Sequence, residues 1–456
     1  MAQINNIKPL TFTVRRRTPE LIVPAKPTPQ ELKPLSDLDE SQVSRVQVSS
    51  IYFYRGDQKM RNKNPASVIR EALSKLLVFY YPFAGRLKEG PKGKLMVDCS
   101  GQGVMFIEAE ADVTLDQFGY PLLPPFPCLD ELLYDVPGSS SILDSPLLLM
   151  QVTRLLNGDF VFAQRLNHTM GDAKGITQFN LALGEIARGA STPSILPVWQ
   201  RDFLCTRDPP RITCTHHAFD EVVGAGENFI PQKDMAYRTF FFGPNEMSNI
   251  RKLVPSHLKN CSTFDVLTAY LWHCRTIALQ PDPKDNMRII FPVDARSKLK
   301  SFIPVGYYGN VVGIAAATST AEELTNKPLS HALELVMKAK FDVTEEYMRS
   351  QTDFMVIKDR PQFTIVGGFI VTDLTRAEMN IVDLGWGKPA YGGPVAGAMY
   401  FTSGYLPFVN NKGESGTAVA ICLPIAAMEK FVEEMNSILA QDNNNQDYNL
   451  PVLSIL

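Results

Sequence analysis

The chain has 456 residues, of which 45% are apolar and 20% are charged, and its formal net charge is −3. This length exceeds the usual size of a single hydrophobic core, so two domains are expected. The charges are balanced and Arg15-Arg16-Arg17 is an isolated basic run, which argues against nucleic-acid binding.

Membrane and secretory segments are not expected either. No run of about 18 apolar residues could span a bilayer, and the first twenty residues lack the apolar core of a secretory signal. The seven cysteines are scattered and show no CxxC spacing, which is typical of reduced thiols and not of a disulfide framework or a zinc site. These features predict a cytoplasmic protein without a metal.

The first half of the chain mixes extended and helical patterns. The proline-rich segment 24–34 is expected to be extended. Apolar residues at helical spacing predict a helix over 65–80. Two strands are expected at 94–99 and 104–108.

A β-hairpin is predicted immediately before one histidine. Two apolar runs, 147–155 and 160–166, are separated by Leu156-Asn157-Gly158-Asp159, and Asn-Gly is a strong hairpin signal. His168 therefore lies just past the second strand. The following segment, 175–186, has helical spacing.

The second half follows a proline-rich crossover segment at 191–210 and a loop-like segment at 220–233. Beyond them strands and helices are mixed again. Helices are expected at 246–253, 263–279, 329–348 and 425–439. Strands are expected at 237–242, 287–293, 310–317, 364–371, 398–408 and 417–422.

These patterns predict an α/β protein with two domains of comparable size and a site between them. We assign residues 1–190 to an N-terminal domain that carries His168, and residues 191–233 to a crossover linker. Residues 234–456 form the predicted C-terminal domain, which includes the turn Asp383-Leu384-Gly385-Trp386-Gly387.

His168 is the residue best placed to carry chemistry. An imidazole at the end of a strand can accept a proton from a hydroxyl or an amine and so activate it. The alternative is a satisfied, half-buried histidine, since one H-x-x-x-D match by chance is no surprise among six histidines. The sequence contains no G-x-S-x-G elbow, no Walker loop and no G-x-G-x-x-G, and His216-His217 lacks zinc spacing.

Two aspartates have structural interpretations from physical chemistry alone. Asp172 either caps the next helix or pairs with an arginine, for which Arg296 is a candidate, and so fixes the loop of His168. Loss of one member of a buried pair of that kind costs about 3–5 kcal/mol. Asp383 opens a turn in which two glycines permit tight backbone and Trp386 serves as an anchor.

His168-Thr169-Met170-Gly171-Asp172, taken with residues 383–387, resembles the paired signature of the plant BAHD acyltransferases. The second motif of that family is usually D-F-G-W-G, so Leu384 is a departure. Within the family the chain is most similar to alcohol acyltransferases of the benzyl alcohol O-benzoyltransferase type. Further matching segments are Phe12-Thr13-Val14-Arg15-Arg16, Tyr81-Pro82-Phe83-Ala84-Gly85-Arg86-Leu87, Ser262-Thr263-Phe264-Asp265, Asp294-Ala295-Arg296, Tyr308-Gly309-Asn310 and Val371-Thr372-Asp373-Leu374-Thr375.

The resemblance implies two chloramphenicol-acetyltransferase-like domains joined by a crossover loop, with an active-site channel between them. His168 would be the general base that takes the acceptor's proton as its oxygen attacks acyl-CoA, without a covalent acyl-enzyme. Asp383 is grouped with His168 as a catalytic candidate and would also maintain its turn. The residues expected to support the site structurally are Asp172, Arg296, Gly385, Trp386 and Gly387.

The resemblance also implies acyl-CoA as a co-substrate and no bound cofactor. Ser262 and Thr263, at the start of a helix, are candidates for binding the CoA phosphates, and a plain N-cap is the alternative. Thr372 is the candidate oxyanion donor, because Leu374 stands where many other branches carry a tryptophan.

The implied reaction forms an ester from a hydrophobic alcohol, such as benzyl alcohol, and a benzoyl, acetyl or similar group, as in plant specialised metabolism. The alternatives are a hydroxylated alkaloid or a polyamine as acceptor, and a non-catalytic ligand-binding homologue. The intact His168, Asp172 and Arg296 argue against the non-catalytic alternative. A monomer is expected, because the two domains already build the site.

Overall fold

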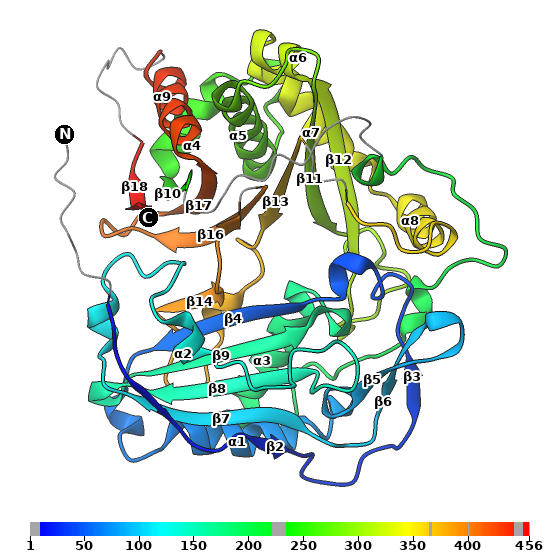
Figure 1. The fold of residues 1–456 in the computed structure, drawn as a ribbon, viewed down its shortest axis with the longest axis vertical. Helices are drawn as coiled ribbons and strands as arrows, with labels where there is room; N and C mark the ends of the chain where they lie inside the picture. Colours follow the sequence, from blue (N-terminus) through cyan, green and yellow to red (C-terminus); the bar gives the residue numbers. More distant parts are fainter. Residues whose placement is uncertain (1–9, 221–233, 364–366, 400, 442–449, 456) are drawn as a thin grey trace. The chain divides into compact units, whose positions relative to one another are not determined.

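The computed structural model describes residues 10–220, 234–363, 367–399, 401–441 and 450–455. The chain forms two compact units. Unit 1 consists of Met1–Cys205, Phe302–Asn310 and Ala377–Ala396, and unit 2 of Thr206–Ser301, Val311–Arg376 and Gly397–Leu456. Each unit has a large β-sheet with helices packed on it (Figure 1). The predicted α/β fold with two sheet-rich domains is therefore confirmed.

The units differ from the contiguous domains 1–190 and 234–456 that the sequence predicts. Unit 1 takes two short segments from the second half of the chain, 302–310 and 377–396. The turn at 383–387, expected in the C-terminal domain, consequently belongs to unit 1. Local patterns cannot reveal such an exchange, because it depends on which segments pack together in three dimensions.

The large sheet of unit 1 has the strand order β1-β7-β8-β9-β4-β14, and β2 also pairs with β7. Among these described strands β7 and β8 run parallel, and the other neighbours are antiparallel. The bounds are β1 (Val14–Arg16), β2 (Glu20–Ile22), β4 (Gln47–Tyr54), β7 (Val104–Ala111), β8 (Leu148–Arg154), β9 (Phe160–Asn167) and β14 (Tyr391–Pro394).

A second, three-stranded sheet and three helices complete unit 1. The strands are β3 (Leu32–Pro34), β5 (Arg86–Glu89) and β6 (Leu95–Asp98), and the helices are α1 (Pro65–Leu76), α2 (Leu129–Leu132) and α3 (Ala173–Ala187). α1 packs against α3 and β8. α1 begins with a regular N-cap: the Asn64 side chain accepts the N–H of Ala66, and Pro65 occupies the first turn.

The hairpin before His168 is confirmed. β8 and β9 pair antiparallel, and Asn157 and Gly158 between them have φ values of 64° and 83°. β9 ends at Asn167, so His168 directly follows the C-terminal end of a strand that lies between β8 and β4 in the sheet. The neighbouring strand β4 was not among the strands that the sequence predicted.

The sheet of unit 2 has the order β12-β11-β13-β16-β17-β10-β18, and β15 pairs with β16. α5 packs against α7 and α9 and also contacts β13. The strands are β10 (Met235–Phe242), β11 (Asn286–Asp294), β12 (Val312–Thr320), β13 (Gly368–Asp373), β15 (Ala398–Met399), β16 (Thr402–Val409), β17 (Ser415–Pro424) and β18 (Val452–Ile455). The helices are α4 (Pro244–Lys252), α5 (Thr263–Leu279), α6 (Ala321–Asn326), α7 (Leu329–Asp342), α8 (Glu345–Ile357) and α9 (Ile425–Gln441).

The single long helix predicted over 329–348 is wrong. The structure has two helices there, α7 and α8, because Val343 leaves the helical region with a ψ of 84° and Thr344 begins a new helix. The Thr344 hydroxyl accepts the N–H of Tyr347 at 3.2 Å, as an N-cap does.

No described helix is long and apolar enough to cross a membrane. Part of the loop-like segment predicted at 220–233 lies outside the described residues.

Candidate active site

His168 opens a short 3-10 turn, His168–Met170, directly after β9. The Asn167 side chain caps this turn by accepting the N–H of Thr169 at 3.2 Å and its hydroxyl at 2.8 Å. The His168 side chain is half-buried. Its Nδ1 is buried and has no hydrogen-bond partner among the described residues. The imidazole is thus held at the end of a strand without being tied to a structural partner through that nitrogen.

The two ends of the 3-10 turn are held by side chains of unit 1 that are distant from the turn in sequence. The Asn310 amide Nδ2 donates to the His168 carbonyl at 2.9 Å. The Arg201 Nη2 donates to the Met170 carbonyl at 2.8 Å. The first and the last carbonyl of the turn therefore each have a specific donor.

Asp39 connects these two donors. Its Oδ1 accepts the Asn310 backbone N–H at 3.0 Å and the Asn310 amide at 2.8 Å, and Arg201 Nη1 lies 3.2 Å from both carboxylate oxygens. The Ser36 N–H and hydroxyl donate to Oδ2 at 3.1 and 2.6 Å. The Arg201 and Asp39 side chains are 1% and 0% exposed. Burial by itself would lower the pKa of Arg201, but Asp39 and the adjacent tyrosines outweigh that effect and raise it, so the cation persists.

Two glycines allow the loop to approach the backbone of Tyr308 closely. A Cβ atom at Gly171 would lie 2.4 Å from the Tyr308 carbonyl oxygen, and one at Gly175 only 2.0 Å from it. Neither distance is possible for a real side chain. The glycines in the segment after His168 are therefore required by packing.

Asp172 is placed as a helix cap. Its Oδ1 accepts the N–H of Gly175 at 3.0 Å at the start of α3, and its side chain is buried. Arg296 lies in unit 2, where its Nη1 is 3.1 Å from Asp294 Oδ1. The pairing of Asp172 with Arg296 stays a prediction.

Asp383 organises its own turn. Its Oδ1 accepts the N–H groups of Gly385 at 2.7 Å and of Gly387 at 2.9 Å, and these glycines have φ values of 109° and 83°. Arg188 donates to the Asp383 carbonyl, and its Nη1 lies 3.7 Å from Oδ2. These contacts hold the shape of the turn, and the assignment of Asp383 as a catalytic residue stays a prediction.

Trp386 and α3 secure the turn. The Trp386 ring packs edge-on against Phe160 of β9, with 5.0 Å between ring centroids. A Cβ atom at Gly184 of α3 would lie 2.3 Å from the Asp383 carbonyl oxygen. Because α3 also carries Gly175, one helix packs closely against both the Tyr308 segment and the turn. The two sequence motifs thus belong to one packed unit.

The start of α5 in unit 2 holds the two candidate CoA-binding hydroxyls. The Ser262 hydroxyl accepts the N–H of Asp265 at 3.3 Å and the Lys340 ammonium at 3.1 Å. Lys340 also pairs with the Asp265 carboxylate. The Thr263 hydroxyl accepts from Arg251 Nη2 at 3.3 Å. Two cations therefore contact the positive end of a helix, where partial charge already favours an anion.

Thr372, the candidate oxyanion donor, lies in β13 and is half-buried. It pairs with Gly404 of β16 in a parallel register. Thr372, Ser262, Thr263 and Arg296 belong to unit 2, whereas His168 belongs to unit 1.

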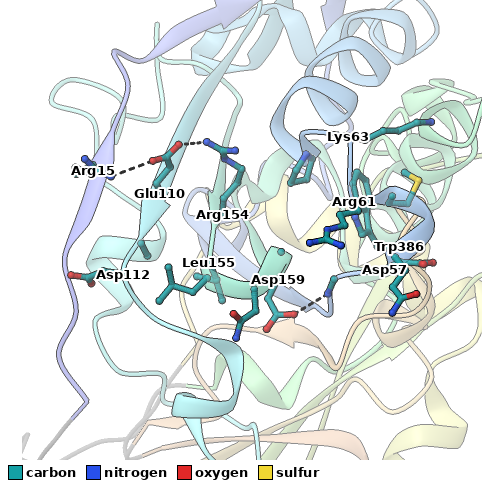
Figure 2. Close-up of a pocket in the computed structure, with 18 of the residues that line it drawn as sticks. Arg15, Asp57, Arg61, Lys63, Glu110, Asp112, Arg154, Leu155, Asp159 and Trp386 are labelled. Carbon is teal, nitrogen blue, oxygen red and sulfur yellow. Dashed lines mark hydrogen bonds and ion pairs between the residues drawn. The ribbon is translucent and has the colours of Figure 1, made fainter.

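A cavity of about 1080 Å³ lies beside the turn of unit 1 (Figure 2). Trp386 and Arg61 line one side, and the opposite side carries Glu110, which is bound by both Arg15 and Arg154. His168 does not line this cavity, so it is separate from the imidazole. Within the described ranges, no group of three His, Cys, Asp or Glu side chains is arranged to hold a metal ion.

Asp39 and Arg201 were not identified from the sequence as site residues. Asp39 sits in the acidic run Asp37-Leu38-Asp39-Glu40, and Arg201 lies two residues beyond Trp199 in the proline-rich linker. Neither position has a motif that indicates a buried ion pair. Asn310 could have been found, since it belongs to the matched segment Tyr308-Gly309-Asn310.

The chain is similar to known transferases over nearly its whole length. A family model described as Transferase matches residues 12–438. A benzyl alcohol O-benzoyltransferase of Petunia hybrida is 58% identical over 437 residues, which cover 95% of each protein. A 13-hydroxylupanine O-tigloyltransferase of Lupinus albus is 52% identical over 444 residues, which cover 96% of this chain and 97% of the lupin protein. The crystal structure of F. graminearum TRI101 complexed with coenzyme A and deoxynivalenol matches 93% of this chain and 100% of its own, with 14% identity and a TM-score of 0.69. That likeness shows a shared fold.

Proposed function

The chain belongs to this transferase family, the BAHD acyltransferases, and from that premise we propose that it moves an acyl group from acyl-CoA to the hydroxyl of a hydrophobic alcohol. Benzyl alcohol is the proposed acceptor, with a benzoyl, acetyl or similar acyl group, because the petunia relative is named for that alcohol. The observation that carries the proposal is the half-buried imidazole of His168, whose Nδ1 has no described partner and whose backbone is held at both ends of its turn.

In the proposed mechanism His168 acts as a general base. It removes the proton of the alcohol as the oxygen attacks the carbonyl carbon of the thioester. The tetrahedral intermediate then expels the CoA thiolate, to which the imidazolium returns the proton. The products are an ester and free CoA, and no covalent acyl-enzyme is formed. Thr372 is the proposed donor to the negatively charged oxygen of the intermediate.

We assign the start of α5 to the phosphates of CoA. Ser262 and Thr263 offer hydroxyl groups there, and Arg251 and Lys340 add positive charge beside them. Part of the charge of Lys340 is balanced by Asp265, so Arg251 supplies the less compensated cation. The structurally similar TRI101 was crystallised with coenzyme A, which is consistent with acyl-CoA as the co-substrate here.

A hydroxylated alkaloid is the second candidate acceptor. It is favoured by the lupin relative, whose name gives 13-hydroxylupanine as the substrate. Both acceptors are alcohols, so the same proton transfer at His168 serves either of them.

A monomer in the cytoplasm is also proposed, and the seven free cysteines agree with a reducing compartment.

The test is release of free CoA from a matrix of acyl-CoAs against benzyl alcohol, aliphatic alcohols and hydroxylated alkaloids, with identification of the ester. His168→Ala should lower kcat by roughly 10²–10⁴-fold, as loss of a general base does. The exposed His217, which pairs with Asp220, supplies the control His217→Ala, which should retain activity. Full turnover by His168→Ala would refute the base assignment. An ester with alkaloids but not with benzyl alcohol would select the second acceptor.

A further inference from the structure

We propose that Asp39 is a positioning residue for His168 and acts through Arg201 and Asn310. This inference rests on the proposed role of His168 as the base and adds how the chain holds that base in place. None of these three residues is placed to exchange a proton with a substrate. Asp39 and Arg201 are fully buried and paired with each other, and Asn310 is a buried amide bound to Asp39 and to the His168 carbonyl.

Each of the two donor side chains binds the carbonyl group at one end of the turn. Asn310 Nδ2 is shared between Asp39 Oδ1 at 2.8 Å and the His168 carbonyl at 2.9 Å. Arg201 uses Nη1 for Asp39 and Nη2 for the Met170 carbonyl. The carbonyl groups at the two ends of the turn are therefore both linked to the Asp39 carboxylate, one through the Asn310 side chain and the other through the Arg201 side chain.

The position of Arg201 leaves little freedom. Its guanidinium carbon lies 4.4 Å from the ring centroid of Trp199, 5.3 Å from that of Tyr307 and 5.0 Å from that of Tyr308. A Cβ atom at Gly309 would lie 1.4 Å from Arg201 Nη1, so the backbone of that segment also closes on the cation. Cation–π contacts and a buried carboxylate both favour this one placement.

A shift of this cluster moves the catalytic base. The imidazole is attached to the first residue of the turn, so a displaced His168 carbonyl tilts the Cα–Cβ bond and with it the ring. A misplacement of about 1 Å at a reacting group can cost roughly 10²-fold in rate. Substrate binding is not expected to depend on this cluster to the same extent, so kcat should change more than KM.

The decisive variant is Asn310→Ala, which removes the link to the His168 carbonyl and leaves the Asp39–Arg201 pair in place. Its matched control is Asn180→Ala, because Asn180 is also fully buried in unit 1 and its amide donates to Tyr52 at 2.9 Å. We expect kcat of Asn310→Ala to fall by roughly 10–100-fold, with KM for both substrates within about threefold. Asn180→Ala should keep kcat within about twofold while showing a comparable loss of thermal stability.

A second readout does not depend on turnover. Ring ¹⁵N signals of the six histidines can be recorded on the labelled protein, with the His168 signal assigned from His168→Ala. Asn310→Ala should shift or broaden the His168 signal, and Asn180→Ala should leave it in place. An unchanged signal together with unchanged kcat would overturn the positioning role. A displaced signal with full kcat would support the positioning role and refute His168 as the base.

If Asn310→Ala does not fold, Arg201→Lys serves the same purpose. It keeps a cation opposite Asp39 and removes the donor to the Met170 carbonyl. The same fall in kcat with a nearly constant KM is expected. Equal losses of kcat in Arg201→Lys and Asn180→Ala would mean that the cluster only supports the fold.

Discussion

The loop of His168 and the turn at 383–387 are organised in the same way at different depths. Asp39 and Asp383 each accept backbone N–H groups and each contact an arginine. The Arg201 and Asp39 side chains are 1% and 0% exposed, whereas those of Arg188 and Asp383 are 41% and 34% exposed. The same kind of ion pair is therefore fully buried in one case and partly exposed to water in the other.

The difference in depth determines how much each pair contributes. An exposed ion pair contributes about 0–1 kcal/mol, because water screens it and solvates either partner when the other is removed. Removing one partner of a buried pair leaves an uncompensated charge and costs about 3–5 kcal/mol. Asp39 should thus be needed for stability, and Asp383 chiefly for the local shape of its turn.

The largest effect is expected from Asp39→Asn. The amide can still accept a hydrogen bond, but it leaves the buried Arg201 without a counter-charge, so the free energy of unfolding should fall by about 3–5 kcal/mol. Denaturant unfolding of the full chain would measure the loss. The double variant Asp39→Leu with Arg201→Met should lose less than the sum of the single changes. A loss below about 1 kcal/mol for Asp39→Asn would show that the Asp39–Arg201 pair contributes no more than an exposed pair does.

An intermediate effect is expected where α3 meets the two regions. Gly175→Ala and Gly184→Ala would place a Cβ atom 2.0 Å from the Tyr308 carbonyl and 2.3 Å from the Asp383 carbonyl. Both contacts are with backbone, so each substitution should cost about 1–3 kcal/mol by overpacking. Only Gly175→Ala should also lower kcat, because the Tyr308 segment leads into Asn310. Lys174→Ala on the same helix is the control, since the contact of Lys174 with Glu378 is exposed. Equal kcat in both glycine variants would show that the two contacts do not differ in function.

The smallest effect is expected from Asp383→Asn. The amide oxygen can still accept the N–H groups of Gly385 and Gly387, and the exposed contact with Arg188 is lost. The free energy of unfolding should fall by less than about 1 kcal/mol, and the difference should shrink at high salt. Asp383→Ala should cost more, about 1–2 kcal/mol, because it removes the acceptor of two N–H groups. If Asp383→Asn were as harmful as Asp39→Asn, the turn would depend on charge and not on hydrogen bonding.

Most of what the sequence predicted correctly depends on short-range chemistry. The hairpin before His168 follows from Asn157-Gly158 between two apolar runs, and α5 begins and ends as predicted, at Thr263 and Leu279. The turn at 383–387 was also interpretable, because its hydrogen bonds to the Asp383 carboxylate come from residues at most four positions away. The break between α7 and α8 was missed although Thr344 is a good N-cap residue, because apolar residues at helical spacing continue across it.

The sequence by itself determined the family, the mixed α/β class and the position of His168 at a strand end, since motifs and hydrophobic periodicity are properties of consecutive residues. Only the tertiary structure decided what holds His168. Asp39 lies 162 residues from Arg201 and 271 residues from Asn310 along the chain. No local pattern connects such residues, because a buried charge is stable only where the folded chain brings a partner to it, and that partner is chosen by packing and not by spacing.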